Sequence, residues 1–150
     1  MKGVLSMKKS IISTDKAPAA IGPYSQAVCV NGIVATSGQL PIDPATGKLV
    51  EGGIQEQTRQ CFRNLAAILE EAELSFDNVI KSTVYLADIR DSAAMNEIYA
   101  QNITSDYPAR SAFQVAALPM GALVEIEVLC ARGEIPTADM LGAPSCGCSL

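Results

Sequence analysis

The chain has 150 residues, of which 49% are apolar and 18% charged, and it carries a formal net charge of −5 with no histidine. A domain of this length buries roughly two-thirds of the surface of its unfolded chain, so one hydrophobic core suffices without disulfides or metal. The absence of histidine excludes Ser-His-Asp and Cys-His nucleophile systems, HExxH zinc sites and histidine acid–base catalysis, and the acidic charge argues against nucleic acid, whose binders carry a basic face.

The first part of the chain predicts a leader followed by a hairpin. Residues 1–8 are expected to form a flexible leader without the long apolar stretch of a signal peptide, and the chain starts either at its first residue or at Met7. In 27–35, two β-favouring runs flank Asn31-Gly32, a pair that tolerates positive φ and so predicts a type I′ turn. The next segment, 41–47, contains two prolines and a glycine and is expected to be a loop.

The middle of the chain changes to a helical period. Apolar residues recur on one stripe between 53 and 72, which predicts a helix there. The members of that stripe are Ile54, Cys61, Leu65, Ile68, Leu69 and Ala72. Residues 79–87 are rich in β-favouring side chains and predict a strand. A second helix is expected from about 91 to 101, presenting Met95, Ile98 and Tyr99.

The last third of the chain predicts two strands joined by a turn. Pro108 opposes helix, and the residues of 111–117 favour a strand. A turn is expected at 118–121 and a final strand at 123–131. Residues 135–150 show no periodicity and predict a mobile tail.

These elements predict an α+β domain over residues 9–134: a hairpin, a helix, a strand, a helix and a final hairpin in one layered unit. Two helices can cover only one face of the sheet. Both alternating sets of the strand at 111–117 are apolar or small, so the uncovered face is expected to need another subunit. Those sets are Ser111, Phe113 and Val115, and Ala112, Gln114 and Ala116.

The five cysteines bear on location and on metal binding. Cys29, Cys61 and Cys130 lie in apolar segments, where a free thiol behaves as a small hydrophobe. Cys146 and Cys148 could chelate a soft metal or form a disulfide, but without histidine or a second cysteine pair no structural zinc site is expected, and an incidental tail thiol pair is favoured. No apolar run reaches the roughly 18 residues of a membrane-spanning helix. The predicted location is the reducing cytoplasm.

Three positions suggest polar chemistry. Arg110 stands where a loop enters a strand, and its planar guanidinium can hold a carboxylate through two hydrogen bonds, although a solvated surface pair is an equal alternative. Glu125 and Glu127 lie two apart on one strand and share a face, so one of them can act as a general base. The alternative is the wet face of a half-buried strand.

Two further segments carry weaker signals. Tyr24 lies on the rigid turn 22–26, where its hydroxyl can form a hydrogen bond or its ring can simply pack. The segment 36–39 contains Ser37 and Gly38, and its free amides can bind an anion or merely end the hairpin.

Taken together and in order, several segments resemble the Rid family of reactive intermediate deaminases, also called the YjgF family. The matching stretches are 17–27, 36–41, 107–111, 115–119 and 125–127. The resemblance runs from about Met7 to Arg132. It implies a chorismate-mutase-like α+β fold, with a single mixed β-sheet, two helices on one face, and assembly into a homotrimer with clefts between subunits.

The resemblance also implies hydrolysis of 2-aminoacrylate or 2-iminobutanoate to pyruvate or 2-oxobutanoate with release of ammonia. An imine is already electrophilic, so no cofactor and no metal is expected, and the partners are small imino and enamino acids and other copies of the chain. By the same resemblance Arg110 binds the substrate carboxylate, while Tyr24 and Glu125 border the reacting carbon and position water. The matched positions that line the cleft are Ser37, Gly38 and Asn96.

Ala112 departs from the cysteine often found at its position, so no thiol role carries over. Relatives of this family have also been described as translation inhibitors that act on RNA, and the acidic charge, the absent histidine and the few aromatic residues argue against that function here. A third alternative is a non-enzymatic module that binds small acids.

Overall fold

A computed structural model describes residues 8–104 and 106–133. The predicted leader, except Lys8, and the predicted tail with Cys146 and Cys148 lie outside the described residues. The strands are β1 (Ser10–Ile12), β2 (Ala27–Val30), β3 (Ile33–Thr36), β4 (Ile42–Asp43), β5 (Lys48–Leu49), β6 (Val79–Leu86), β7 (Ala109–Gln114) and β8 (Val124–Ala131). The helices are α1 (Ile54–Glu71) and α2 (Ser92–Asn102), with 3-10 turns at Phe76–Asn78, Ile89–Asp91 and Pro119–Gly121.

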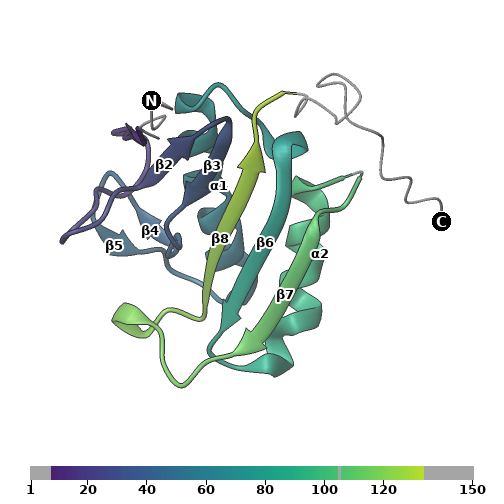
Figure 1. Ribbon diagram of the computed structural model, residues 1–150. Coiled ribbons are helices and arrows are strands. Elements are labelled where there is room, and N and C mark those ends of the chain that lie inside the picture. Colours follow the sequence, from purple (N-terminus) through teal and green to yellow (C-terminus); the bar gives the residue numbers. More distant parts are fainter. Residues whose placement is uncertain (1–7, 105, 134–150) are drawn as a thin grey trace, which may run out of the picture.

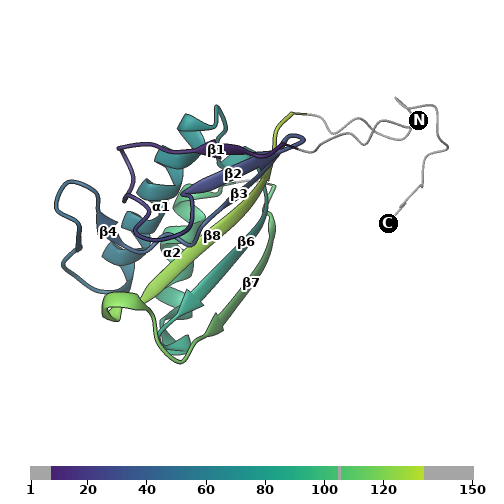
Figure 2. The same cartoon turned by 60° about the vertical axis from the view of Figure 1, so that its left-hand side comes forward.

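One mixed sheet forms the centre of the molecule (Figure 1). Its six strands follow the order β1-β2-β3-β8-β6-β7, and only β6 and β7 run parallel. Figure 2 shows that α1 and α2 lie on the same side of this sheet and leave the other face open. The predicted α+β class with both helices on one face is therefore confirmed. None of the described helices is long and apolar enough to cross a membrane.

The predicted hairpin is confirmed. Residues Asn31 and Gly32 both adopt positive φ, at 49° and 78°, as a type I′ turn requires. The turn joins β2 to β3 with Val30 opposite Ile33. The turn depends on the backbone preferences of Asn31 and Gly32 alone, and the local sequence is therefore enough to predict it.

Both predicted helices are present, and their apolar residues form the core. At the start of α1, the Glu56 carboxylate accepts a hydrogen bond of 2.9 Å from the amide of Gly53. The predicted stripe of α1 is fully buried apart from Ile54, which packs against the core. On α2 the three residues expected inside, Met95, Ile98 and Tyr99, are buried.

The predicted final hairpin is wrong. β7 pairs in parallel with β6, and β8 lies between β3 and β6. α2 provides the crossover that a parallel pair needs. Along β8, fully buried side chains alternate with half-buried ones, and a strand pairs with β8 on each side. Every residue of β7 is exposed, as expected for a strand at the edge of the sheet. β7 spans 109–114 instead of 111–117, because its partner β6 ends where Leu86 faces Gln114.

Two short pairings were not predicted. β1 adds an edge strand beside β2. The expected loop at 41–47 contains β4 and leads through a tight turn to β5, which pairs with β4 in a small second sheet. Asn64 of α1 fixes the start of this segment, because its side-chain amide donates hydrogen bonds to the carbonyls of Leu40 and Ile42 at 3.0 and 2.9 Å.

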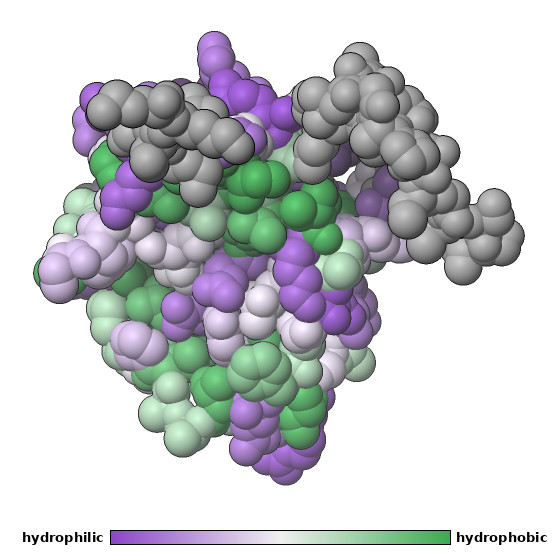
Figure 3. Space-filling view, in the orientation of Figure 1, coloured by the Kyte–Doolittle hydropathy of each residue, from purple (hydrophilic) through white to green (hydrophobic). Residues whose placement is uncertain are grey.

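The open face of the sheet carries an apolar region at one end. Six half-buried side chains gather there, and the strand register places them side by side. We call them the open-face cluster: Val28, Val30, Ile33, Ala35, Leu129 and Ala131. Figure 3 looks onto this face and shows apolar residues over the end of β8 that carries Leu129. Towards the other end, β8 presents Glu125 and Glu127 on the same face.

Candidate active site

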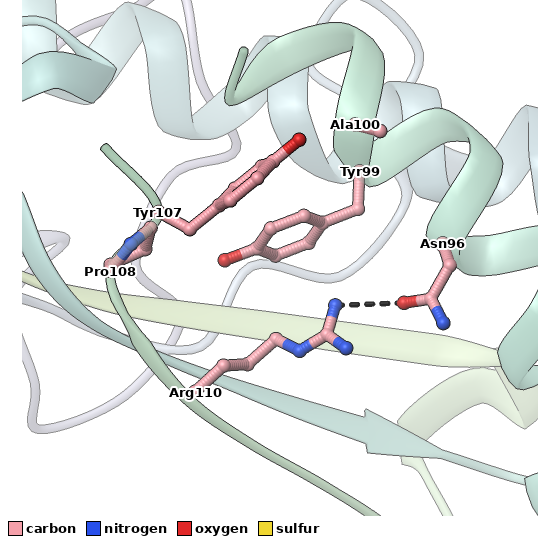
Figure 4. A pocket seen from close by; sticks show the side chains of 6 residues that line it. All are labelled: Asn96, Tyr99, Ala100, Tyr107, Pro108 and Arg110. Atoms are coloured by element: carbon pink, nitrogen blue, oxygen red, sulfur yellow. Dashed lines mark hydrogen bonds between the residues drawn. The ribbon is translucent and has the colours of Figure 1, made fainter. Parts of the chain in front are cut away.

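Arg110 projects from the start of β7 towards α2 (Figure 4). Its Cα lies opposite Ser82 of β6, whose buried side chain faces the helices. The guanidinium Nη1 donates a hydrogen bond of 2.8 Å to Asn96 Oδ1. Its Cζ lies 4.6 Å from the centre of the Tyr99 ring. Two of the residues that the resemblance places in the cleft, Arg110 and Asn96, are therefore in direct contact.

These residues line a cavity of about 350 Å³ together with Ala100, Tyr107 and Pro108. Arg110 is exposed, and within the described part of the chain it forms no ion pair. A guanidinium has five N–H donors in a fixed plane, and such a plane matches a carboxylate. The cavity is therefore suited to a small organic acid.

Glu125 and Glu127 occupy the open face of β8. Burial of the Glu125 carboxyl, and secondly the charge of Glu127, raise the pKa of Glu125 above that of an ordinary glutamate. Glu127 accepts a hydrogen bond of 2.9 Å from the hydroxyl of Tyr85, whose own pKa is raised by burial and by Glu127. A carboxyl group with a raised pKa is better matched to proton transfer near neutral pH, which makes Glu125 a candidate base.

Gly38 lies directly against Glu125. The segment after β3 is joined to β8 by backbone hydrogen bonds of 2.8 and 3.1 Å between Gln39 and Ile126. A Cβ at position 38 would lie 2.0 Å from Glu125 Oε1. Only glycine leaves room for the carboxyl group in this position, so the predicted role of Gly38 in the cleft has a steric reason.

Ser37 connects the end of β3 to the segment that carries Tyr24. The Ser37 hydroxyl donates to the carbonyl of Ser25 at 2.6 Å, and its amide donates to Gln26 at 2.8 Å. Tyr24 is 54% exposed, and its hydroxyl accepts a hydrogen bond of 3.2 Å from the amide of Ile21. Tyr24 and Gly38 line a second cavity of about 420 Å³. Its apolar walls include Ile21, Leu40, Ile42 and Met120.

The predicted site residues therefore form two groups within one chain. Arg110 and Asn96 lie on the helix side of the edge strand β7, whereas the second group is linked through Gly38 to Glu125 on the open face of β8. The second group comprises Tyr24, Ser37, Gly38 and Glu125. The two cavities share no lining residue among those described. A single chain thus does not bring Arg110 to the candidate base Glu125.

Sequence reasoning missed Tyr99 and Tyr85 as members of these groups. Tyr99 was expected only as core, yet it lies three residues after Asn96, a spacing that places both on one face of a helix. Tyr85 could be recognised only after the register put it opposite Glu125. Within the described residues, no group of three or more His, Cys, Asp or Glu side chains is arranged to hold a metal ion.

Comparison with known proteins assigns the chain to a family. The family model described as Endoribonuclease L-PSP matches residues 14–132. The 2-iminobutanoate/2-iminopropanoate deaminase of Capra hircus is 53% identical over 135 residues, which cover 90% of this chain and 98% of the relative.

Solved structures agree with this assignment. A protein of the conserved Rid family from Yersinia pestis has a TM-score of 0.81 and 50% identity, covering 83% of this chain and 99% of that one. E. coli TdcF with bound serine has a TM-score of 0.78 and 42% identity, covering 83% of this chain and 99% of that one. Because the family model and these relatives each span most of its length, the chain belongs to the Rid family, to which the Endoribonuclease L-PSP model also applies.

Proposed function

We propose that this chain is a deaminase that hydrolyses 2-imino acids, and the enamines from which they form, to 2-oxo acids and ammonia. Its substrates are 2-aminoacrylate and 2-iminobutanoate. The relatives named as 2-iminobutanoate/2-iminopropanoate deaminases, at about half identity over 90% of the chain, support this activity. The observation that carries it is the guanidinium of Arg110, which is held in an open cavity of the size that a small organic acid needs.

The residues present suit each step of this reaction. Arg110 binds the carboxylate and fixes the substrate. An enamine first gains a proton on its terminal carbon and loses one from its nitrogen, and it thereby becomes the imine. Glu125 then takes a proton from water as the oxygen bonds to the imine carbon, and it returns the proton to nitrogen. The product of this addition is a carbinolamine. Its hydroxyl gives up its proton to Glu125, which passes a proton to the nitrogen as the carbon–nitrogen bond breaks, so that a carbonyl forms and ammonia leaves. One water is consumed, and the reaction balances without metal or cofactor.

The complete site is composite. Arg110 and Asn96 of one subunit meet Tyr24, Ser37, Gly38 and Glu125 of a neighbouring subunit in a homotrimer, with a chorismate-mutase-like arrangement of the three sheets. The separation of the two groups within one chain supports this assembly, as does the open-face cluster, which needs apolar cover. The location of the enzyme is the cytoplasm, in keeping with the free thiols of Cys29, Cys61 and Cys130.

A turnover assay tests the function. 2-Iminobutanoate is generated in the presence of a competing nucleophile, and formation of 2-oxobutanoate is followed with and without the protein. Arg110→Lys keeps the charge but loses the two-pronged grip, so we expect kcat/KM to fall by about 100-fold while the protein stays folded. The matched control is Arg63→Lys, at an exposed position of α1, which leaves kcat/KM unchanged. Unaltered turnover in folded Arg110→Lys contradicts the carboxylate-binding role.

The description Endoribonuclease L-PSP makes RNA cleavage the alternative to test beside deamination. A net charge of −5 opposes binding to a polyanion. The same preparation is incubated with labelled RNA at low salt. Cleavage that depends on Arg110, without imine hydrolysis, would establish the alternative. Binding of 2-oxobutanoate without either reaction would instead identify a non-enzymatic module that binds small acids.

A further inference from the structure

Tyr99 is fixed from two sides between the core and the Arg110 cavity. Its ring meets the Phe62 ring edge to face, with centroids 5.5 Å apart and an interplanar angle of 82°. Its hydroxyl forms a buried hydrogen bond of 2.7 Å with the hydroxyl of Ser82. The residue is only 5% exposed, yet it lines the cavity. Its ring therefore has a defined orientation where the cavity begins.

The same strand pair positions Tyr99 and Arg110. Ser82, which binds the Tyr99 hydroxyl, is the partner of Arg110 in the parallel register of β6 and β7. The position of Ser82 in the sheet thus fixes both the ring of Tyr99 and the start of the Arg110 side chain. The guanidinium Cζ lies 4.6 Å from the ring centroid, within the roughly 6 Å over which an aromatic face attracts a cation.

Stacking on a ring leaves the hydrogen-bonding edges of a guanidinium free. Asn96, three residues before Tyr99 on α2, accepts from Nη1 at one edge. The guanidinium Cζ lies over the Tyr99 ring, and the one hydrogen bond that the guanidinium forms with the described residues is that to Asn96, so four of its five N–H donors have no hydrogen-bond acceptor among those residues. Helix α2 therefore holds the charged group in two ways that leave donors for a carboxylate (Figure 4).

We propose that Tyr99 is a positioning residue, whose ring fixes the plane of the Arg110 guanidinium for binding the substrate carboxylate. This role rests on the proposed deaminase function of the same site. The ring is the part that orients the guanidinium, and the hydroxyl anchors the ring through its hydrogen bond with Ser82. Loss of the ring weakens the grip on substrate and product alike, because both carry the same carboxylate.

Two substitutions separate the ring from the hydroxyl. Tyr99→Leu removes the ring, and we expect KM for 2-iminobutanoate and the Kd of 2-oxobutanoate to rise together by about fivefold to tenfold. Tyr99→Phe keeps the ring, so we expect both constants to stay within about twofold of the wild-type values. Ile98→Val, a buried control on the same helix, loosens packing and leaves KM unchanged. A merely structural role would reduce the active fraction, so kcat would fall at constant KM.

A measurement on the wild-type protein keeps the test decisive if Tyr99→Leu does not fold. In the NMR spectrum, the ring current should shift the Arg110 Nε proton upfield in the wild-type and Tyr99→Phe proteins. An unshifted proton, equal KM increases in both variants, or a loss of kcat alone in Tyr99→Leu overturns the proposal. Absence of turnover in the wild-type protein contradicts the deaminase function instead, and the NMR shift and the binding of 2-oxobutanoate then still decide the role of Tyr99.

Discussion

Glu125 is held in an environment that disfavours its charged form. Burial and the neighbouring Glu127 raise its pKa in the folded protein, so the folded state loses stability as the pH rises through that pKa. Glu125→Gln removes the ionisation. We therefore expect this variant to have a higher Tm than the wild-type protein at pH 7, with a difference that shrinks towards about pH 4. Its kcat should fall on the order of 100-fold, because the base is gone.

Glu127→Gln is the matched control for this prediction. It leaves Glu125 in place and removes the charge beside it, so its effect on kcat should be much smaller. Thermal unfolding from pH 4 to 8 and turnover assays on both variants measure the two effects. Equal losses of kcat would show that the wrong carboxylate has been chosen as the base.

Gly38 allows the Glu125 carboxyl group to approach the backbone. In Gly38→Ala the new Cβ would lie 2.0 Å from Glu125 Oε1, and the side chain would have to swing away. Because the obstructed atoms belong to the end of a flexible side chain, stability should change by less than about 1 kcal/mol. Displacing the base should lower kcat about 100-fold, since misplacement of about 1 Å has that effect.

Gly53→Ala provides the control for this substitution. Gly53 has a φ of −93°, and a Cβ there would approach nothing closer than 3.8 Å. Its turnover should equal that of the wild-type protein. If Gly38→Ala retained full kcat, the contact between Gly38 and Glu125 would have no part in the reaction.

Among the elements, β3 and β8 carry the face that we expect to form the subunit interface of the proposed homotrimer. Leu129 of β8 lies opposite Ala35 of β3 within the open-face cluster. A charge there would be buried in a trimer, so Leu129→Glu should give monomers by light scattering at micromolar concentration. It should also abolish turnover, because the two halves of the site then never meet.

Ala66→Glu on α1 is the control, since Ala66 is exposed on the helix surface. It should leave both the trimer and the turnover intact. A wild-type protein that is a monomer at micromolar concentration, or a fully active monomeric Leu129→Glu variant, would contradict the composite site.

For the molecule as a whole, we expect the proposed reaction to need no metal, because the electrophile is already present in the substrate. The chain contains no histidine, and the two tail cysteines lie outside the stretch that matches the family model. Deaminase activity should therefore survive both a strong chelator and truncation after about Glu134. Loss of activity on chelation, restored by zinc only when Cys146 and Cys148 are present, would contradict the cofactor-free mechanism.

The elements that depend on neighbouring residues could be predicted from the amino-acid sequence. The Asn31-Gly32 turn follows from two backbones that tolerate positive φ. α1 follows from an apolar stripe whose members meet on one side of a helix, and β8 from the alternation of buried residues with Glu125 and Glu127. The resemblance places Arg110, Asn96, Tyr24, Ser37, Gly38 and Glu125 in one cleft; within the chain, Arg110 and Asn96 lie 2.8 Å apart, and the other four lie apart from them.

The order of the strands in the sheet and the contacts among the site residues follow from the folded chain and could not be predicted from local sequence patterns. The last two strands look like a hairpin in the sequence, but β7 joins β6 through the α2 crossover and leaves β8 in the middle of the sheet. This strand order places Arg110 on the face of the sheet that the helices cover and Glu125 on the open face. It also places Ser82 within hydrogen-bonding distance of the Tyr99 hydroxyl. Strand pairing is a contact between residues far apart in the chain, and local propensity does not encode it, whereas turns and helical stripes require only near neighbours.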